Sequence, residues 1–197
     1  MTDRVRSILI AGVGGQGVLK ASDILSAVII EAGLDVKKSE VHGMAQRGGC
    51  VTSHVRYGKR VFSPLARKGD VDVLLSFEKL ETLRYLDYLN DEGRVIINDL
   101  EVYPPSVNMG EAEYPENVID LVRDRVRAVE VLNASDTASK LGDARMVNTV
   151  LLGVLSRYME IPGEIWEKVL RETFSPKVVE KNIEAFRTGR DKRAVLK

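Results

Sequence analysis

The stretch Ile8-Leu-Ile-Ala-Gly12-Val-Gly14-Gly15-Gln16-Gly17-Val18 predicts a strand, a glycine turn and a helix. The apolar residues 8–10 are typical of a buried strand, and apolar residues with helical spacing begin at Val18. In this context a G-x-G-x-x-G motif favours ligand binding, because the free N–H groups and the dipole of the helix attract an anion such as phosphate. The alternative is a turn that only packs the helix on the sheet. The candidate ligand- or partner-facing residues here are Gly12, Gly14, Gly15, Gln16 and Gly17.

Length and composition are those of a globular domain. The 197 residues are 44% hydrophobic and 29% charged, which is enough for one domain over 1–197 with a sizeable core. The net charge of zero gives no general attraction to nucleic acid. We find no signal peptide and no apolar run long enough for a membrane span, so we expect a cytoplasmic protein without nucleic-acid or membrane partners. The single cysteine, Cys50, cannot form an internal disulfide or hold a metal or iron–sulfur site alone.

The charges are unevenly distributed along the chain. Residues 1–68 carry a net charge of +6, residues 69–130 carry −9, and residues 131–197 carry +3. This separation suits a protein whose N-terminal part meets a partner or an anionic ligand. Solvated loops and helix faces are an equally good explanation.

A second unusual stretch is Glu40-Val-His42-Gly43-Met44-Ala-Gln46-Arg47-Gly48-Gly49. Its three glycines predict an unusual backbone, and Arg47 has a planar fork that can bind a carboxylate or a phosphate. A surface loop whose arginine pairs with a nearby acid is the alternative, but the density of glycine and polar residues favours a functional loop. The candidate residues are Glu40, His42, Gly43, Met44, Gln46, Arg47, Gly48 and Gly49. Glu40 also lies where a dinucleotide-binding fold has its ribose-binding acid, about 20 residues after the glycines.

The rest of the chain alternates strands and helices. Residues 50–57 alternate in polarity, and a tight turn into 61–62 predicts a β-hairpin. Further strands are expected at 71–76, 94–98 and 128–132, with helices between them and a long acidic loop after residue 100. The C-terminal region is helical from about 134, and Gly189 is expected to end the last helix. The fold class predicted is α/β: a Rossmann-like three-layer domain, mostly parallel, with a β-hairpin and a helical C-terminal region.

The two glycine-rich stretches, in this order and spacing, resemble the gamma-type domain of the 2-oxoacid:ferredoxin oxidoreductase family. The form His-Gly-Met-Ala-Gln-Arg-Gly-Gly at 42–49 is most similar to small (beta) subunits of the indolepyruvate type. The resemblance spans nearly the whole chain and includes the closing segment Ser-Pro-Lys-Val-Val-Glu-Lys-Asn-Ile-Glu-Ala-Phe at 175–186.

The resemblance implies a subunit of an enzyme that oxidatively decarboxylates a 2-oxo acid, with an aryl pyruvate such as indolepyruvate preferred. Thiamine diphosphate and 4Fe-4S clusters would belong to a large alpha subunit in an α2β2 assembly, with coenzyme A as co-substrate and ferredoxin as electron acceptor. This chain would then bind no cofactor or metal alone, supply no catalytic residue and be inactive alone. The glycine turn and the 40–49 loop would face the partner's active site, where they help to hold coenzyme A or close the substrate channel.

Two alternatives stay open at this point. One is an NAD(P)-dependent dehydrogenase of the Rossmann type, although Gln16 and the 42–49 loop do not match a hydride-transfer site. The other is a non-catalytic adaptor that only stabilises the large subunit.

Overall fold

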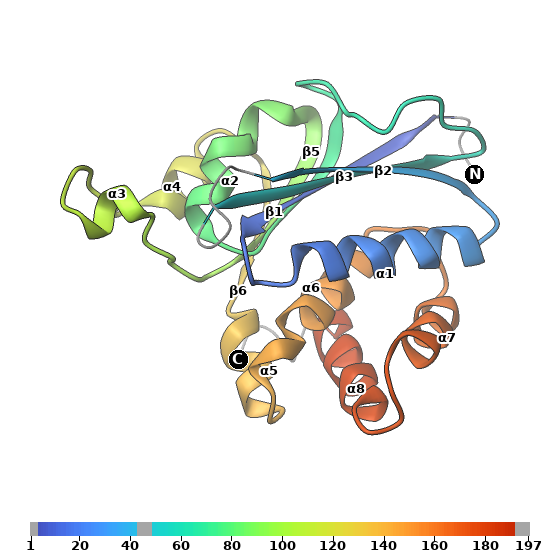
Figure 1. Cartoon of the computed structure of the whole chain (residues 1–197). Coiled ribbons are helices and arrows are strands. Elements are labelled where there is room, and N and C mark those ends of the chain that lie inside the picture. Colours follow the sequence, from blue (N-terminus) through green and yellow to red (C-terminus); the bar gives the residue numbers. More distant parts are fainter. Residues whose placement is uncertain (1–3, 43–48, 192–197) are drawn as a thin grey trace.

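The computed structural model describes residues 4–42 and 49–191, which form a six-stranded sheet covered by helices on both faces (Figure 1). The strand order is β2-β3-β1-β4-β5-β6. The strands are β1 (Arg6–Val13), β2 (Asp35–His42), β3 (Cys50–Gly58), β4 (Val71–Ser76), β5 (Leu89–Asn98) and β6 (Ala128–Leu132). The predicted three-layer α/β fold is confirmed.

The sheet is mostly parallel, as predicted. Strands β1, β4, β5 and β6 pair in parallel, and only β3 runs against its neighbours. Parallel strands need crossover connections, which the helices between them provide. The carboxyl ends of the parallel strands therefore meet at one edge of the sheet.

The predicted β-hairpin between 50–57 and 61–62 is wrong. Strand β3 instead lies between β1 and β2, where Val55 is opposite Ile8 on one side and Lys38 on the other. Both edges of β3 are therefore already hydrogen-bonded, which leaves no edge for 61–62. The Val61 N–H instead donates to Asp35 Oδ2 at 2.7 Å. The antiparallel pair that is formed by two strands adjacent in the chain is therefore β2–β3.

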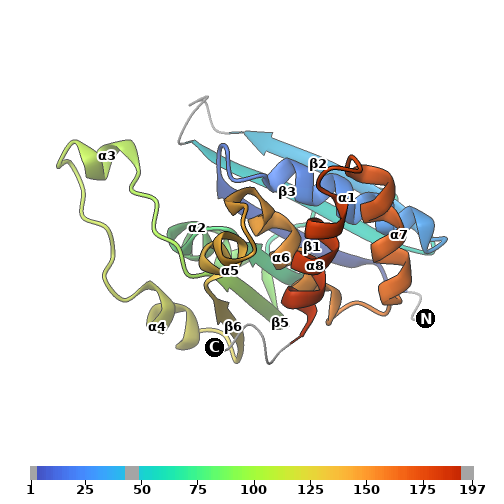
Figure 2. The same ribbon diagram turned by 90° about the horizontal axis from the view of Figure 1, so that it is seen from below.

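One face of the sheet carries the larger core, formed with α1 (Val18–Glu31), α5 (Ala134–Lys140), α6 (Val147–Ser156), α7 (Gly163–Thr173) and α8 (Val179–Arg190). Figures 1 and 2 show these helices together on that face. Trp166 and Phe186 are fully buried there, with their rings stacked at 5.5 Å. Each such side chain contributes roughly 1.5–3 kcal/mol of hydrophobic stabilisation. Within the described ranges, no helix has both the length and the apolarity to cross a membrane.

The opposite face carries a smaller core under α2 (Lys79–Tyr85) and α4 (Val118–Arg123). Short 3-10 helices lie at Leu86–Tyr88 and Ala144–Met146. Between β5 and α4 the chain leaves the body as an arm that carries α3 (Pro105–Asn108), the segment predicted as a long acidic loop (Figures 1 and 2).

The prediction that Gly189 ends the last helix is wrong, because α8 continues to Arg190. A Cβ on Gly189 would lie 2.0 Å from the Val150 carbonyl oxygen, and a Cβ on Gly153 would lie 2.2 Å from that of Phe186. Both glycines are therefore needed where α6 and α8 cross with their backbones in contact.

Candidate functional site at the carboxyl edge of the sheet

The glycine turn connects β1 to α1 at the carboxyl edge. Gly15 and Gly17 have φ angles of +98° and +86°, which L side chains rarely adopt. Gly12 has a different role, since a Cβ there would lie 2.7 Å from Gln16 Oε1 and 2.9 Å from Phe77 Cβ. The motif therefore combines two left-handed positions with one close approach to β4.

Gln16 locks this turn in place. Its Oε1 accepts a hydrogen bond from the Val13 N–H at 2.7 Å, and its Nε2 donates to the Phe77 carbonyl at 3.4 Å. The side chain thus ties the turn to the end of β4, which is a structural reason for a glutamine at this position.

Replacing Gln16 with methionine should lower the free energy of unfolding by about 1–2 kcal/mol, because the Val13 N–H loses its acceptor. Gln16→Glu is the matched control, since its carboxylate still accepts that bond, and we expect a smaller loss. Urea denaturation of the full chain measures both values. Equal stability of Gln16→Met and the parent chain would show that the side chain does not hold the turn.

Asn98 joins the same network from the end of β5. Its Nδ2 donates to the Phe77 carbonyl at 3.0 Å and to Ser135 Oγ at 3.2 Å, and its Oδ1 accepts the Ala134 N–H at 2.9 Å. Asn98 is fully buried. It therefore fixes the start of α5 against the turn rather than being free to bind a ligand.

A cavity of about 420 Å³ opens beside this network. Asn148 on α6 borders it, with Nδ2 3.1 Å from where a Cβ on Gly17 would lie. The lining residues are Gly15, Gln16, Gly17, Phe77, Asn98, Leu100, Ser135, Ala144, Arg145, Val147 and Asn148. Sequence analysis missed Ser135, Arg145 and Asn148 because they lie far along the chain. An asparagine within the apolar pattern of α6 was the only signal.

Arg145 lies at the rim of this cavity and is paired with Asp143. Their closest contact is 2.7 Å, between Nη2 and Oδ2. Hydrogen bonds from Arg145 lower the pKa of Asp143 to about 2, so the carboxyl group stays ionised near neutral pH. An anionic ligand would have to compete with Asp143 for this guanidinium group.

A second cavity, of about 450 Å³, borders the N-terminus of α1. The first intrahelical bond runs from the Ala21 N–H to the Gly17 carbonyl at 2.9 Å, so the three N–H groups before it have no acceptor within the helix. With the helix dipole, such groups favour an anion. The lining residues are Val13, Gly14, Gly15, Gly17, Val18, Leu19, Lys20 and Val51.

The second glycine-rich stretch meets the first at this edge. The Gly14 N–H donates to the Gly49 carbonyl at 2.9 Å. His42 ends β2, where its backbone is opposite Val51 of β3. The predicted residues Gly43, Met44, Gln46, Arg47 and Gly48 lie outside the described residues.

Glu40 is not in the geometry of a dinucleotide site. It accepts a bond from Lys38 Nζ at 2.6 Å, and Lys38 also pairs with Asp23 of α1. Strand β3 separates β2 from β1, whereas a ribose-binding acid follows the strand next to β1. Glu40 therefore belongs to a surface ion-pair group on the α1 side of the sheet.

Cys50 is half-buried and contacts Tyr85. Its Sγ lies 2.9 Å from the Tyr85 hydroxyl oxygen. Burial, and to a lesser extent a hydrogen bond with Glu81, raises the pKa of the thiol to about 11. The thiol is therefore protonated at neutral pH and is a poor nucleophile.

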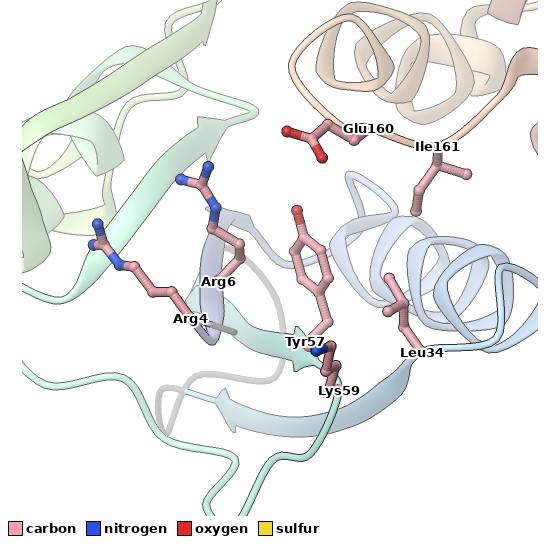
Figure 3. Close-up of a pocket in the computed structure, with 8 residues that line it drawn as sticks. Arg4, Arg6, Leu34, Tyr57, Lys59, Glu160 and Ile161 are labelled. Atoms are coloured by element: carbon pink, nitrogen blue, oxygen red, sulfur yellow. The ribbon is translucent and has the colours of Figure 1, made fainter. Parts of the chain in front are cut away.

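A smaller cavity, of about 60 Å³, lies at the opposite, amino edge of the sheet. Arg6, Tyr57 and Glu160 point toward one another there (Figure 3). Burial raises the pKa of Tyr57 to about 12, so its hydroxyl is neutral, and Asp72 holds both Arg4 and Arg6 at 3.3 and 3.2 Å. None of the residues predicted from sequence lines this cavity, which shares no residue with the two cavities at the carboxyl edge.

The fold and the edge geometry define a Rossmann-like α/β domain with a glycine-lined carboxyl edge. Comparisons with known proteins then show the family. The model of the family "pyruvate ferredoxin/flavodoxin oxidoreductase" matches residues 7–192. The chain therefore belongs to this family, and the family prediction made from the two glycine-rich stretches is confirmed.

Among curated proteins, the indolepyruvate oxidoreductase subunit IorB of Archaeoglobus fulgidus is 42% identical, over 93% of this chain and 92% of that protein. The protein of the same name from Pyrococcus horikoshii is 38% identical, over 93% of each. These relatives fit the prediction of an oxidoreductase subunit and not that of an NAD(P)-dependent dehydrogenase.

Two solved structures share the fold. The pyruvate oxidoreductase subunit PORC of Thermotoga maritima has a TM-score of 0.73 at 23% identity, over 94% of this chain and 95% of that one. The 2-oxoglutarate:ferredoxin oxidoreductase of Magnetococcus marinus, solved with 2-oxoglutarate, coenzyme A and succinyl-CoA, has a TM-score of 0.72 at 25% identity, over 96% of this chain and 31% of that chain. This chain thus corresponds to about a third of the larger protein.

Proposed function

We propose that this chain is the small subunit of an indolepyruvate-type 2-oxoacid:ferredoxin oxidoreductase and completes an active site formed with a larger subunit. The observation that carries the proposal is the Gly14–Gly49 hydrogen bond, which joins the two family motifs at one edge of the sheet. The test compares dye reduction by the large subunit with and without this chain.

The single cysteine of this chain supports placing the redox chemistry in the partner. An iron–sulfur cluster is held mainly by cysteine thiolates, and this chain has a single cysteine, whose thiol is protonated at neutral pH. Thiamine diphosphate and 4Fe-4S clusters then belong to the large subunit, where they supply decarboxylation and electron transfer to ferredoxin. We place this chain in an α2β2 complex in the cytoplasm.

The residues at the carboxyl edge fit coenzyme A, which carries phosphate groups. Val18, Leu19 and Lys20, whose N–H groups precede the first intrahelical bond of α1, line a cavity, and Gly15 and Gly17 add no side chains to it. In this proposal the chain binds and orients the co-substrate and helps to exclude water from the partner's reaction centre. The 42–49 loop would serve the same edge, as partner-facing or ligand-facing residues.

A charge introduced beside the shared glycines tests the coenzyme A role. Ala144 is exposed and lines the cavity of about 420 Å³, which shares Gly15 and Gly17 with the cavity at the start of α1, so in this proposal coenzyme A spans both cavities. In the complex with the large subunit, Ala144→Glu should raise the KM for coenzyme A roughly fivefold to tenfold by repelling its phosphates. Ala144→Lys adds a side chain of similar length with the opposite charge and should not raise that KM.

Ala112→Glu places the same charge on the exposed arm, away from both cavities, and serves as the control. An equal rise in KM for the glutamate and lysine variants of Ala144 would mean steric blocking. An unchanged KM for coenzyme A in both Ala144 variants would mean that coenzyme A does not bind in this cavity.

A further inference from the structure

The arm, residues 99–117, is fixed at its base although it projects from the body (Figures 1 and 2). The carboxylate of Glu78, which is 1% exposed, accepts the Tyr114 hydroxyl at 2.5 Å and the Val102 N–H at 3.3 Å. The rings of Tyr103 and Tyr114 lie 5.2 Å apart. The buried carboxylate thus holds the chain both where it enters the arm, at Val102, and where it leaves the arm, at Tyr114. The arm therefore presents its other residues in a defined position.

The exposed surface of the arm is acidic and apolar. Met109 is 65% exposed and Tyr103 is 52% exposed, and both residue types are enriched in protein interfaces. The arm contains no lysine or arginine. Three of its carboxylates form no ion pair within the described residues; they belong to Glu111, Glu113 and Glu116.

A complementary surface lies on the strap, which we define as residues 59–70 between β3 and β4. The strap has no regular secondary structure but is held firmly, because Arg56 Nη1 donates to the carbonyls of Ser63 and Leu65 at 3.2 Å each. Ala66 packs into the smaller core, while Phe62 is 82% exposed and Leu65 is 50% exposed.

The strap is basic where the arm is acidic. Arg60 lies over the Phe62 ring at 4.8 Å, and neither Arg60 nor Arg67 has a carboxylate partner among the described residues. Lys68 pairs with Asp87, but both of those side chains are largely exposed. The strap thus offers two apolar side chains beside two guanidinium groups without acidic partners.

We propose that the arm of one copy of this chain docks on the strap of a second copy. The unpaired carboxylates of the arm would meet Arg60 and Arg67, while Met109 and Tyr103 would cover Phe62 and Leu65. The docking residues Tyr103, Met109, Phe62 and Leu65 line neither carboxyl-edge cavity, so the inference does not rest on the proposed function.

The fold allows this contact to form twice. Tyr114 of the arm and Ala66 of the strap pack against the same smaller core, so both elements belong to the α2/α4 side of the sheet. Along that side they lie toward opposite ends of the molecule (Figure 1). In the proposed dimer a two-fold axis would place each arm over the other copy's strap, so that the contact forms twice and the assembly closes.

Sedimentation equilibrium of the full chain tests the dimer. We expect a dimer whose dissociation constant rises between about 50 and 500 mM salt, because screening weakens exposed charge pairs. Glu111→Arg/Glu113→Arg should raise the dissociation constant at least about tenfold, and Arg60→Glu/Arg67→Glu should do the same. Combining all four changes should restore most of the association, since the charges are again complementary.

The matched control is Glu172→Arg/Glu184→Arg, which makes the same charge change on exposed positions of α7 and α8, on the other face of the sheet. It should leave the dissociation constant unchanged. The proposal would be overturned if the chain stayed monomeric at all concentrations up to about 100 μM. It would also be overturned if the variant with all four changes dimerised no more tightly than either double variant. A third contrary result would be that the parent chain alone is monomeric while the Glu111→Arg/Glu113→Arg variant binds the large subunit more weakly. The arm would then dock on the large subunit and not on a second copy.

Discussion

Gly189→Ala is expected to lower the free energy of unfolding by roughly 3 kcal/mol or more. In most helix interiors this substitution stabilises, because alanine loses less backbone entropy than glycine. Here the new Cβ would lie 2.0 Å from the Val150 carbonyl oxygen and 2.9 Å from its carbon, both backbone atoms of α6. Two packed helices would have to separate, which also loosens the contact between Trp166 and Phe186.

Gly163→Ala is the control, because a Cβ at the start of α7 would meet only the Arg190 side chain at 3.5 Å, an ordinary contact. We expect it to be neutral or to stabilise by up to about 1 kcal/mol. Gly153→Ala should be as harmful as Gly189→Ala, because both act on the same crossing. Thermal and urea unfolding of the three variants would contradict the account if Gly189→Ala kept the stability of the parent chain.

The strands and helices were largely predictable because their signals are local. Residues 128–132 were predicted as a strand and form β6 with the same bounds. The strand, turn and helix at residues 8–18 follow from adjacent apolar and glycine patterns. The partner of β3 was not predictable from alternation alone. The alternation of polar and apolar residues over 50–57 indicates a strand, but it does not show which strands lie beside that strand.

Gly189 shows a second limit of sequence reasoning. A glycine near the end of a helical pattern is typical of a C-terminal cap, and the sequence alone cannot show that another helix lies against it. The close contact with Val150 arises only when α6 and α8 are packed together.

At the candidate site, the sequence identified the glycine turn but not why Gln16 is there. The Val13 and Phe77 groups that bind Gln16 come from β1 and from the end of β4, which only the folded sheet brings together. Ser135 and Asn148 could not be found for the same reason, because their positions at the cavity depend on how α5 and α6 pack.

The largest functional effect is expected when this chain is added to its large partner subunit. This chain alone should be folded, colourless and inactive toward 2-oxo acids, because its single, protonated cysteine cannot hold a cluster. The complex should reduce ferredoxin or a viologen dye in the presence of a 2-oxo acid and coenzyme A. Aryl pyruvates such as indolepyruvate should be better substrates than pyruvate.

The most direct measurement is the rate of viologen reduction by the purified large subunit, with indolepyruvate and coenzyme A, before and after addition of this chain. We predict turnover only after addition, with activity rising until the two chains are present in equal amounts. Equal rates with and without this chain would contradict the account, since the chain would then not be part of the catalytic unit.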